Sequence, residues 1–189
     1  MTAEQDPLVE HVVEPLAQAE RRGGARAWLN ALDLSAYRAI RSLARDERGV
    51  AAVRRFSSLG EHGAVWLGLG ALGSVVDRRR SARWRRATLA VGGAYLVSTT
   101  IKVAIGRQRP AVEDLPALMA TPTGLSFPSS HSSSSFAAAQ AYSRLLPAGA
   151  LYAFAVPMAM SRLFLGVHYP SDILAGAALG TVLGRWGRA

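Results

Sequence analysis

Residues 161–172 read Ser-Arg-Leu-Phe-Leu-Gly-Val-His-Tyr-Pro-Ser-Asp and join two apolar runs near the end of the chain. Pro170 suits the first turn of a helix, so we expect His168 just before a helix start and Asp172 one turn further on, on the same face. Such a carboxylate can fix the tautomer of the imidazole, and the guanidinium of Arg162 offers paired donors to a phosphate. The stretch predicts a phosphoryl-transfer site between two helices. A plainer interpretation makes Asp172 a capping acid and Arg162 an anchor at a membrane interface.

The composition favours a membrane protein. Half of the 189 residues are hydrophobic and the mean hydropathy is +0.14, which is high for a soluble chain. The formal net charge of +9 would also suit a nucleic-acid-binding protein, but the basic residues are scattered around apolar runs. We therefore expect no nucleic-acid partner. Cysteine is absent, which excludes disulfide bonds and thiolate metal sites.

Residues 1–58 are predicted to form amphipathic helices that precede the membrane domain. Residues 8–22 carry apolar side chains on one side of a possible helix, and residues 26–57 combine apolar residues at helical spacing with interleaved arginines. This pattern is typical of helices that lie on a membrane surface. A soluble amphipathic helix packed on a partner would show the same stripe. No apolar core of a signal peptide is present.

Residues 59–189 are predicted to form an all-α integral membrane bundle of about five spans. The expected spans are residues 59–76, 87–106, 132–146, 148–166 and 173–186. The first two are near the length that crosses a bilayer, and the last is short. The third opens with serines and is the least apolar, so we expect it to face protein instead of lipid. In the last span, Gly176, Gly180 and Gly184 recur at four-residue intervals, which permits close helix contact.

This connectivity brings to one side of the membrane the polar residues that apolar helical periodicity does not account for. The second and fourth spans end there and the third and fifth begin there, with Lys102, Arg109, Ser129, Ser130, His131, Ser161, Arg162, His168 and Asp172. The opposite side receives the six arginines of residues 77–86 and Arg144, Arg185 and Arg188. By the positive-inside rule the arginine-rich side is cytoplasmic, which places the site at the outer face of the plasma membrane. Five spans then place the N-terminal segment outside despite its nine arginines, which conflicts with the same rule.

Two further motifs on the site side suit an anion. Lys102 and Arg109 are seven residues apart, so they share a face if the helix is continuous up to Pro110. The sequence Pro-Ser-Ser-His at residues 128–131 precedes the third span, where hydroxyls and free N–H groups can bind an anion. Alternatively, Lys102 extends to the interface and the serines form a flexible turn beside an incidental His131. Together these groups favour a phosphate site.

These motifs resemble the signature of the type 2 phosphatidic acid phosphatase superfamily. Its K-x6-R-P motif corresponds to residues 102–110, P-S-G-H to 128–131, and S-R-x5-H-x3-D to 161–172. The first and third motifs match in full, and Ser130 stands where the family usually has glycine. The resemblance covers residues from about 59 to the end. Larger members have six spans, whereas surface helices replace the first span here.

The resemblance implies a metal-independent membrane phosphatase that uses no cofactor and forms a phosphohistidine. His168 would attack phosphorus, Asp172 would orient it, and His131 would protonate the leaving alkoxide. The phosphate oxygens would be held by Lys102, Arg109, Arg162, Ser129 and the backbone at Ser130. Phosphoryl transfer depends mainly on positioning and charge stabilisation, which these groups provide.

The substrate is predicted by analogy to be a lipid phosphate. The Ala- and Arg-rich, lysine-poor composition suggests a high-GC bacterium, and the compact architecture resembles small actinobacterial members assigned to polyprenyl-phosphate chemistry. We expect decaprenylphosphoryl-5-phosphoribose, an intermediate of cell-wall arabinan synthesis. Phosphatidylglycerophosphate, phosphatidic acid and undecaprenyl diphosphate stay open as alternatives. A non-enzymatic membrane anion-binding protein would use the cations but would not need two histidines and Asp172. The oligomeric state is not predicted.

Overall fold

The computed structural model describes residues 7–44 and 46–188, and the regular elements of this part are all helices apart from one isolated bridge between Gln108 and Leu125. Residues 1–6, 45 and 189, which the predicted regions 1–58 and 59–189 include, lie outside the described residues. In chain order the helices are α1 (Pro7–Arg22), α2 (Ala25–Arg41), α3 (Glu47–Ser58), η1 (Glu61–Gly63), α4 (Ala64–Val76), η2 (Arg78–Arg80), α5 (Ser81–Ile105), α6 (Ser130–Ala141), η3 (Tyr142–Arg144), α7 (Ala148–Phe164) and α8 (Pro170–Gly187). The predicted all-α fold is confirmed.

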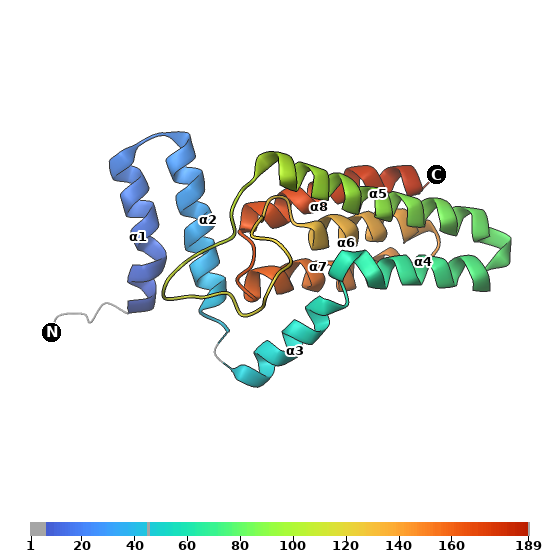
Figure 1. Cartoon of the computed structure of the whole chain (residues 1–189), viewed down its shortest axis with the longest axis horizontal. Coiled ribbons are helices and arrows are strands. Elements are labelled where there is room, and N and C mark those ends of the chain that lie inside the picture. Colours follow the sequence, from blue (N-terminus) through green and yellow to red (C-terminus); the bar gives the residue numbers. More distant parts are fainter. Residues whose placement is uncertain (1–6, 45, 189) are drawn as a thin grey trace.

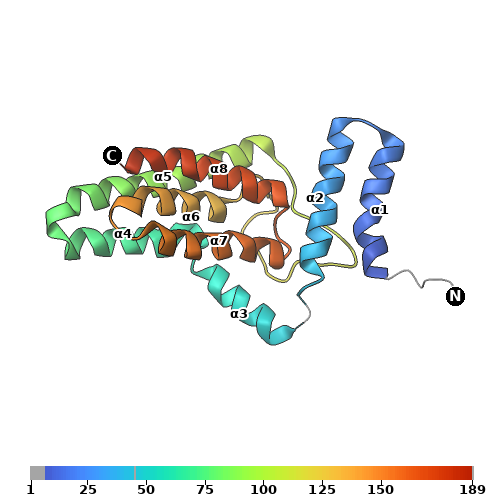
Figure 2. The same cartoon turned by 180° about the vertical axis from the view of Figure 1, so that it is seen from behind.

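Helices α4 to α8 run side by side along the long axis of the molecule, and the α1–α2 hairpin stands across one end of this bundle (Figure 1). The view from behind shows the same arrangement, with α3 leading from α2 back to the bundle (Figure 2). The irregular segment 106–129 lies between α2 and the bundle end (Figure 1). The segments predicted to carry the site therefore meet beneath the hairpin.

Helix α6 lies in the middle of the bundle, as its serine-rich start predicts. Ser132, Ser133, Ser134 and Ser135 are all buried, and α8 packs directly on this face. A side chain at Gly184 would place its Cβ 2.6 Å from the Ala137 carbonyl oxygen, and side chains at Gly176 and Gly180 would meet the backbone of α6 in the same way. The four-residue glycine spacing thus permits the close helix contact expected of it.

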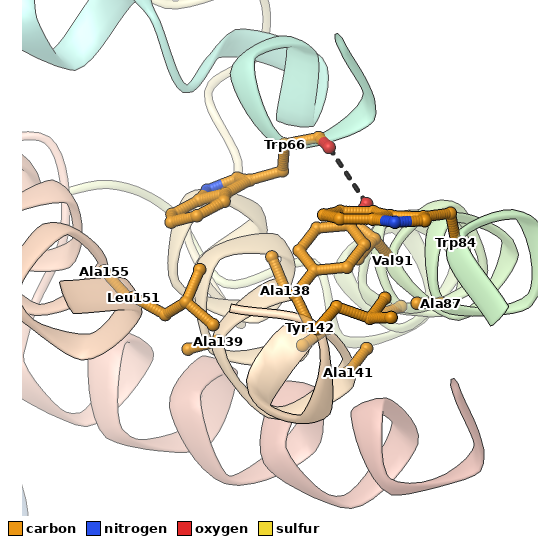
Figure 3. Close-up of a cluster of buried hydrophobic side chains, with 13 residues drawn as sticks. Trp66, Trp84, Ala87, Val91, Ala138, Ala139, Ala141, Tyr142, Leu151 and Ala155 are labelled. Carbon is orange, nitrogen blue, oxygen red and sulfur yellow. Dashed lines mark hydrogen bonds between the residues drawn. The ribbon is translucent and has the colours of Figure 1, made fainter. Parts of the chain in front are cut away.

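A cluster of buried aromatic and alanine side chains fastens the α4–α5 hairpin to α6 and α7 (Figure 3). The Tyr142 hydroxyl donates a hydrogen bond of 3.0 Å to the Trp66 carbonyl oxygen, drawn as the dashed line in Figure 3. The Trp84 and Tyr142 ring centroids lie 5.4 Å apart, which is typical of favourable aromatic pairs. The Trp66 indole nitrogen donates to Ser135 Oγ at 2.9 Å, so the polar atoms of these aromatic residues have partners despite burial.

Several predicted boundaries are wrong. Helix α5 ends at Ile105 because Gly106 takes a left-handed conformation with φ 68°, so Arg109 lies in a loop and not on a continuous helix with Lys102. Helix α4 has only 13 residues, against the 18 expected for the first span. In the described part, residues 78–105 form the one helix long and apolar enough to cross a membrane; α7 is apolar but shorter. The count of about five spans stays a prediction.

Helix α2 packs against the bundle through polar contacts. The Tyr37 hydroxyl donates to the Leu115 carbonyl oxygen at 3.1 Å, and the Arg41 guanidinium donates to the Pro116 carbonyl oxygen at 2.7 Å. Gly166, with φ 72°, leaves the space that these two side chains occupy. This face of α2 therefore packs on segment 106–129 and on the turn after α7. Trp28, Leu29 and Leu32 are exposed, so a membrane-surface location for α2 stays a prediction.

Candidate active site

A cavity of about 130 Å³ opens at the bundle end beneath α2, with walls from η1, α5, segment 106–129, α6, α7 and the turn after α7. It is lined by six of the residues predicted to act on phosphate: Lys102, Arg109, Ser130, His131, Arg162 and His168. Asp172 contacts His168 but does not line the cavity, and Ser129, the N-cap of α6, does not line it either. Predicted site residues as far apart in the sequence as Lys102 and His168, 66 positions, thus line one cavity.

His168 is held from behind by Asp172. The distance from His168 Nδ1 to Asp172 Oδ2 is 3.3 Å, and the same carboxylate oxygen accepts a hydrogen bond of 2.9 Å from the Tyr169 N–H. Asp172 therefore caps α8 and also contacts the histidine. Its role in orienting His168 for catalysis stays a prediction. A carboxylate can only accept, so the hydrogen belongs on Nδ1 and a lone pair is left on Nε2.

Three cations surround this imidazole. Arg109 Nη1 lies 3.2 Å from His168 Nε2 and donates to the Val167 carbonyl oxygen at 2.6 Å. Burial, together with the charges of Arg109, Arg162 and Lys102, holds the pKa of His168 well below its usual value. The lowered pKa favours the neutral imidazole, whose Nε2 lone pair is then available.

Lys102 and Arg162 are buried instead of extending to an interface. Lys102 is 8% exposed and its Nζ donates to the carbonyl oxygens of Ser126 at 2.9 Å and Pro128 at 2.8 Å. Arg162 is 3% exposed and its Nη1 donates to Ser57 Oγ at 2.8 Å. The alternatives of a snorkelling lysine and an interfacial arginine are therefore wrong. Both cations face the cavity from helices packed on opposite sides of it.

The start of α6 presents a first turn to the cavity. Ser129 is the N-cap, and its side chain accepts from the Ser132 N–H at 3.4 Å, so its hydroxyl is engaged in the helix end instead of lining the cavity. Ser130 lines the cavity, and its Oγ lies 3.1 Å from Ser98 Oγ on α5. His131 Nε2 lies 3.2 Å from the Ser57 carbonyl oxygen. The serine-rich segment is thus an ordered helix start and not a flexible turn.

Sequence reasoning missed a charged network behind the histidine. Arg107 donates to Asp172 Oδ1 at 2.9 Å and to Asp33 Oδ2 on α2 at 2.7 Å. Asp33 also accepts from the Ser171 N–H at 2.8 Å, and the Arg107 guanidinium carbon lies 4.3 Å from the centre of the Tyr169 ring. The one local signal was an acid at position 33, four residues before Tyr37 on the buried face of α2.

The pattern of the PAP2 superfamily matches residues 83–188, more than half of the chain. The chain belongs to the PAP2 superfamily. It is 39% identical over 147 residues to the decaprenylphosphoryl-5-phosphoribose phosphatase of Mycobacterium tuberculosis, a match that covers 77% of this chain and 83% of that protein. The crystal structure of Aquifex aeolicus LpxE superposes with a TM-score of 0.72 at 26% identity, over 82% of this chain and 94% of that one.

A second solved structure extends the likeness in fold. The first transmembrane PAP2-type phosphatidylglycerolphosphate phosphatase from Bacillus subtilis gives a TM-score of 0.67 at 23% identity, over 94% of this chain and 92% of that one. The predicted enzyme class, a membrane lipid phosphatase of the phosphoric monoester hydrolases, is thereby confirmed. Among the residues that the structure describes, no group of three or more His, Asp or Glu side chains could hold a metal ion. Metal independence stays a prediction.

Proposed function

We propose that this PAP2 phosphatase hydrolyses a lipid phosphate monoester in two displacements at His168. The observation that carries this proposal is the pair of histidines on one cavity, with His168 backed by Asp172 and flanked by Arg109. The Nε2 lone pair of His168 attacks phosphorus while the ester P–O bond breaks, and His131 gives a proton to the departing alkoxide. Water then attacks the phosphohistidine, His131 takes its proton, and inorganic phosphate leaves.

The cations carry the charge of the transferring group. Lys102, Arg109 and Arg162 converge on the cavity, and the free N–H groups at the start of α6 add donors to the same space. Groups that are already fixed by backbone and side-chain partners need no reorganisation as charge moves onto the equatorial oxygens. Ser129 contributes by holding the first turn of α6.

As substrate we propose decaprenylphosphoryl-5-phosphoribose, in cell-wall arabinan synthesis. The similarity to the mycobacterial phosphatase named for this lipid supports the choice, because it extends over most of both chains. We further propose that the enzyme resides in the plasma membrane with the cavity at the outer face. The arginines at the opposite bundle end, which line a separate polar cavity formed by Gln140, Arg144, Arg185 and Arg188, support that orientation.

The test is phosphate release by the purified protein in detergent from a panel of four lipids, with His168→Ala as the matched control. The panel is decaprenylphosphoryl-5-phosphoribose, phosphatidylglycerophosphate, phosphatidic acid and undecaprenyl diphosphate. We expect the highest kcat/KM on the first lipid, activity that survives EDTA, and loss of all but a few per cent of turnover in the variant. A variant that retains turnover while folded would overturn the phosphohistidine mechanism, and a preference for another lipid would reassign the substrate.

A further inference from the structure

One wall of the cavity comes from residues that none of the three motifs includes. Glu61 and His62 of η1 and Tyr95 and Thr99 of α5 line the same enclosure as the two histidines. Glu61 and His62 also lie outside residues 83–188, which match the superfamily. The reacting groups thus belong to the shared family region, whereas half of this wall is supplied by a segment that the family pattern does not cover.

The wall is held in a defined shape. His62 Nδ1 lies 2.7 Å from the Tyr95 hydroxyl, and the two rings pack edge to face with centroids 5.8 Å apart. His62 has φ 54° and ψ 17°, a left-handed conformation that is rare for residues other than glycine and that clusters at functional sites. A Cβ at Gly60 would lie 2.9 Å from the His131 ring, so η1 is packed directly against the proposed general acid.

This wall lies on the side of the cavity from which the leaving group would depart. In phosphoryl transfer the attacking and leaving atoms are roughly in line, so the alcohol departs on the side away from His168. His131, which protonates that alcohol, lies against Gly60 at the start of η1. The part of the lipid next to the phosphate must therefore lie along Glu61, His62 and Tyr95.

The chemistry of the wall suits hydroxyl groups. Tyr95, Thr99 and Lys102 stand at helical positions i, i+4 and i+7, so polar groups extend for about 10 Å along α5 from the phosphate cations. Glu61 lines the cavity at an exposed position, where its carboxylate is an acceptor within electrostatic reach of Arg162. The Tyr95 hydroxyl is already paired with His62 Nδ1, and the Thr99 hydroxyl donates to the Tyr95 carbonyl oxygen at 2.9 Å, so each oxygen keeps a lone pair for one further donor. A plain alkyl chain in this place would leave that capacity and the Glu61 carboxylate unused and away from water, at a cost in binding.

We propose that Glu61, His62, Tyr95 and Thr99 form a subsite for a sugar or other polyol that lies between the cleaved phosphate and the lipid tail. This assignment rests on the proposed phosphatase function and deepens it, because it selects a substrate class among lipid phosphates. A site that hydrogen-bonds substrate hydroxyls discriminates strongly against analogues that lack them. Lipids whose phosphate is attached directly to an alkyl chain are then poor substrates.

The experiment compares two soluble lipid analogues with the same tail: dodecyl ribofuranoside 5-phosphate, which has a ribose next to the phosphate, and dodecyl phosphate, which has none. The wild type should prefer the riboside in kcat/KM by at least about tenfold. Glu61→Gln and Tyr95→Phe should each lower kcat/KM on the riboside by about tenfold or more and leave dodecyl phosphate within about threefold. Thr99→Val should act in the same direction, whereas Thr100→Val, at an exposed position outside the cavity, should change neither substrate.

Three other outcomes would contradict the proposal. Equal losses on both analogues in Glu61→Gln, Tyr95→Phe and Thr99→Val would mean that the wall only supports the fold or the phosphate site. A wild type that cleaves both analogues equally well would overturn the subsite and leave the phosphatase function intact. A wild type that cleaves neither analogue nor the lipids of the larger panel would overturn the phosphatase function and the subsite together. Thermal unfolding in detergent identifies any variant that fails to fold, and the subsite is then judged on the kinetics of the variants that do fold.

Discussion

The two histidines of the cavity differ in the hydrogen-bond partners of their rings. His168 has a carboxylate behind it and a guanidinium 3.2 Å from its free nitrogen. The His131 ring has as its hydrogen-bond partner, among the described residues, the neutral carbonyl of Ser57 at 3.2 Å. A buried carboxylate orients an imidazole and stabilises the positive charge that develops when it attacks phosphorus. The neutral partner of His131 suits the proposed role of this residue, which is to exchange a proton with the departing alcohol.

This division of roles predicts a leaving-group dependence for His131→Ala. General acid catalysis contributes roughly 10²–10⁴-fold and matters most when the leaving group is poor. We expect a loss of that size in kcat on a lipid phosphate, whose alkoxide needs a proton, and a much smaller loss on p-nitrophenyl phosphate. Steady-state kinetics on both substrates measure the difference. Equal losses on the two would exclude His131 as the proton donor.

At the scale of elements, α2 acts on the site through a chain of ionic contacts. Asp33 holds Arg107 at 2.7 Å, Arg107 holds Asp172 at 2.9 Å, and Asp172 holds His168. Because Asp33 also accepts from the Ser171 N–H, it fixes the first turn of α8 as well. The N-terminal hairpin is therefore in position to orient His168, the proposed nucleophile, through Arg107 and Asp172.

We predict that Asp33→Asn lowers kcat by about tenfold to a hundredfold with little change in KM, the range seen when a group that orients a functional histidine is altered. Glu20→Gln, on the exposed surface of α1, is the matched control and should leave kcat unchanged. Vanadate affinity should also change little, because the phosphate cations are untouched. An Asp33→Asn protein that unfolds at lower temperature but keeps the wild-type kcat would assign α2 a purely structural role.

At the scale of the whole molecule, charge is distributed unevenly between the two bundle ends. Arg144, Arg185 and Arg188 line one polar cavity, and Arg86 donates to the Trp186 carbonyl oxygen at 2.9 Å, which joins the arginine-rich turn to the end of α8. The end of α5, the start of α6 and the end of α7, which contribute to the walls of the proposed active-site cavity, lie at the other end with the α1–α2 hairpin (Figure 1). The hairpin thus shares the predicted outer face with the site, although its arginines would favour the cytoplasm.

The short arginine-rich turn should decide the orientation, because arginine bias acts mainly through short loops close to the spans. The protein has no cysteine, so single introduced cysteines report without background. We expect Ser81→Cys to resist an impermeant maleimide in intact cells and to label after permeabilisation, whereas Ala117→Cys, in the exposed part of segment 106–129, should label in both. The reverse pattern would mean that the enzyme acts on lipids of the cytoplasmic leaflet.

The sequence by itself determined the all-α fold class and named six of the residues that line the cavity. Local signals carried this information: Pro170 at the start of α8, Pro147 before α7 and the serines at the start of α6 stand where the structure has those ends. Fixed spacing did the same for His168 and Asp172, because a four-residue interval at a helix start brings the two side chains together whatever surrounds them.

Only the tertiary structure decided how distant segments meet. Arg109 reaches His168 from a loop, because Gly106 ends the helix that sequence spacing had extended to Pro110. The pairing of Asp33 with Arg107 joins residues 74 positions apart, and His62 meets Tyr95 across 33. Such contacts leave no periodic trace in the sequence, because each partner is set by the packing of whole helices and not by the residues beside it.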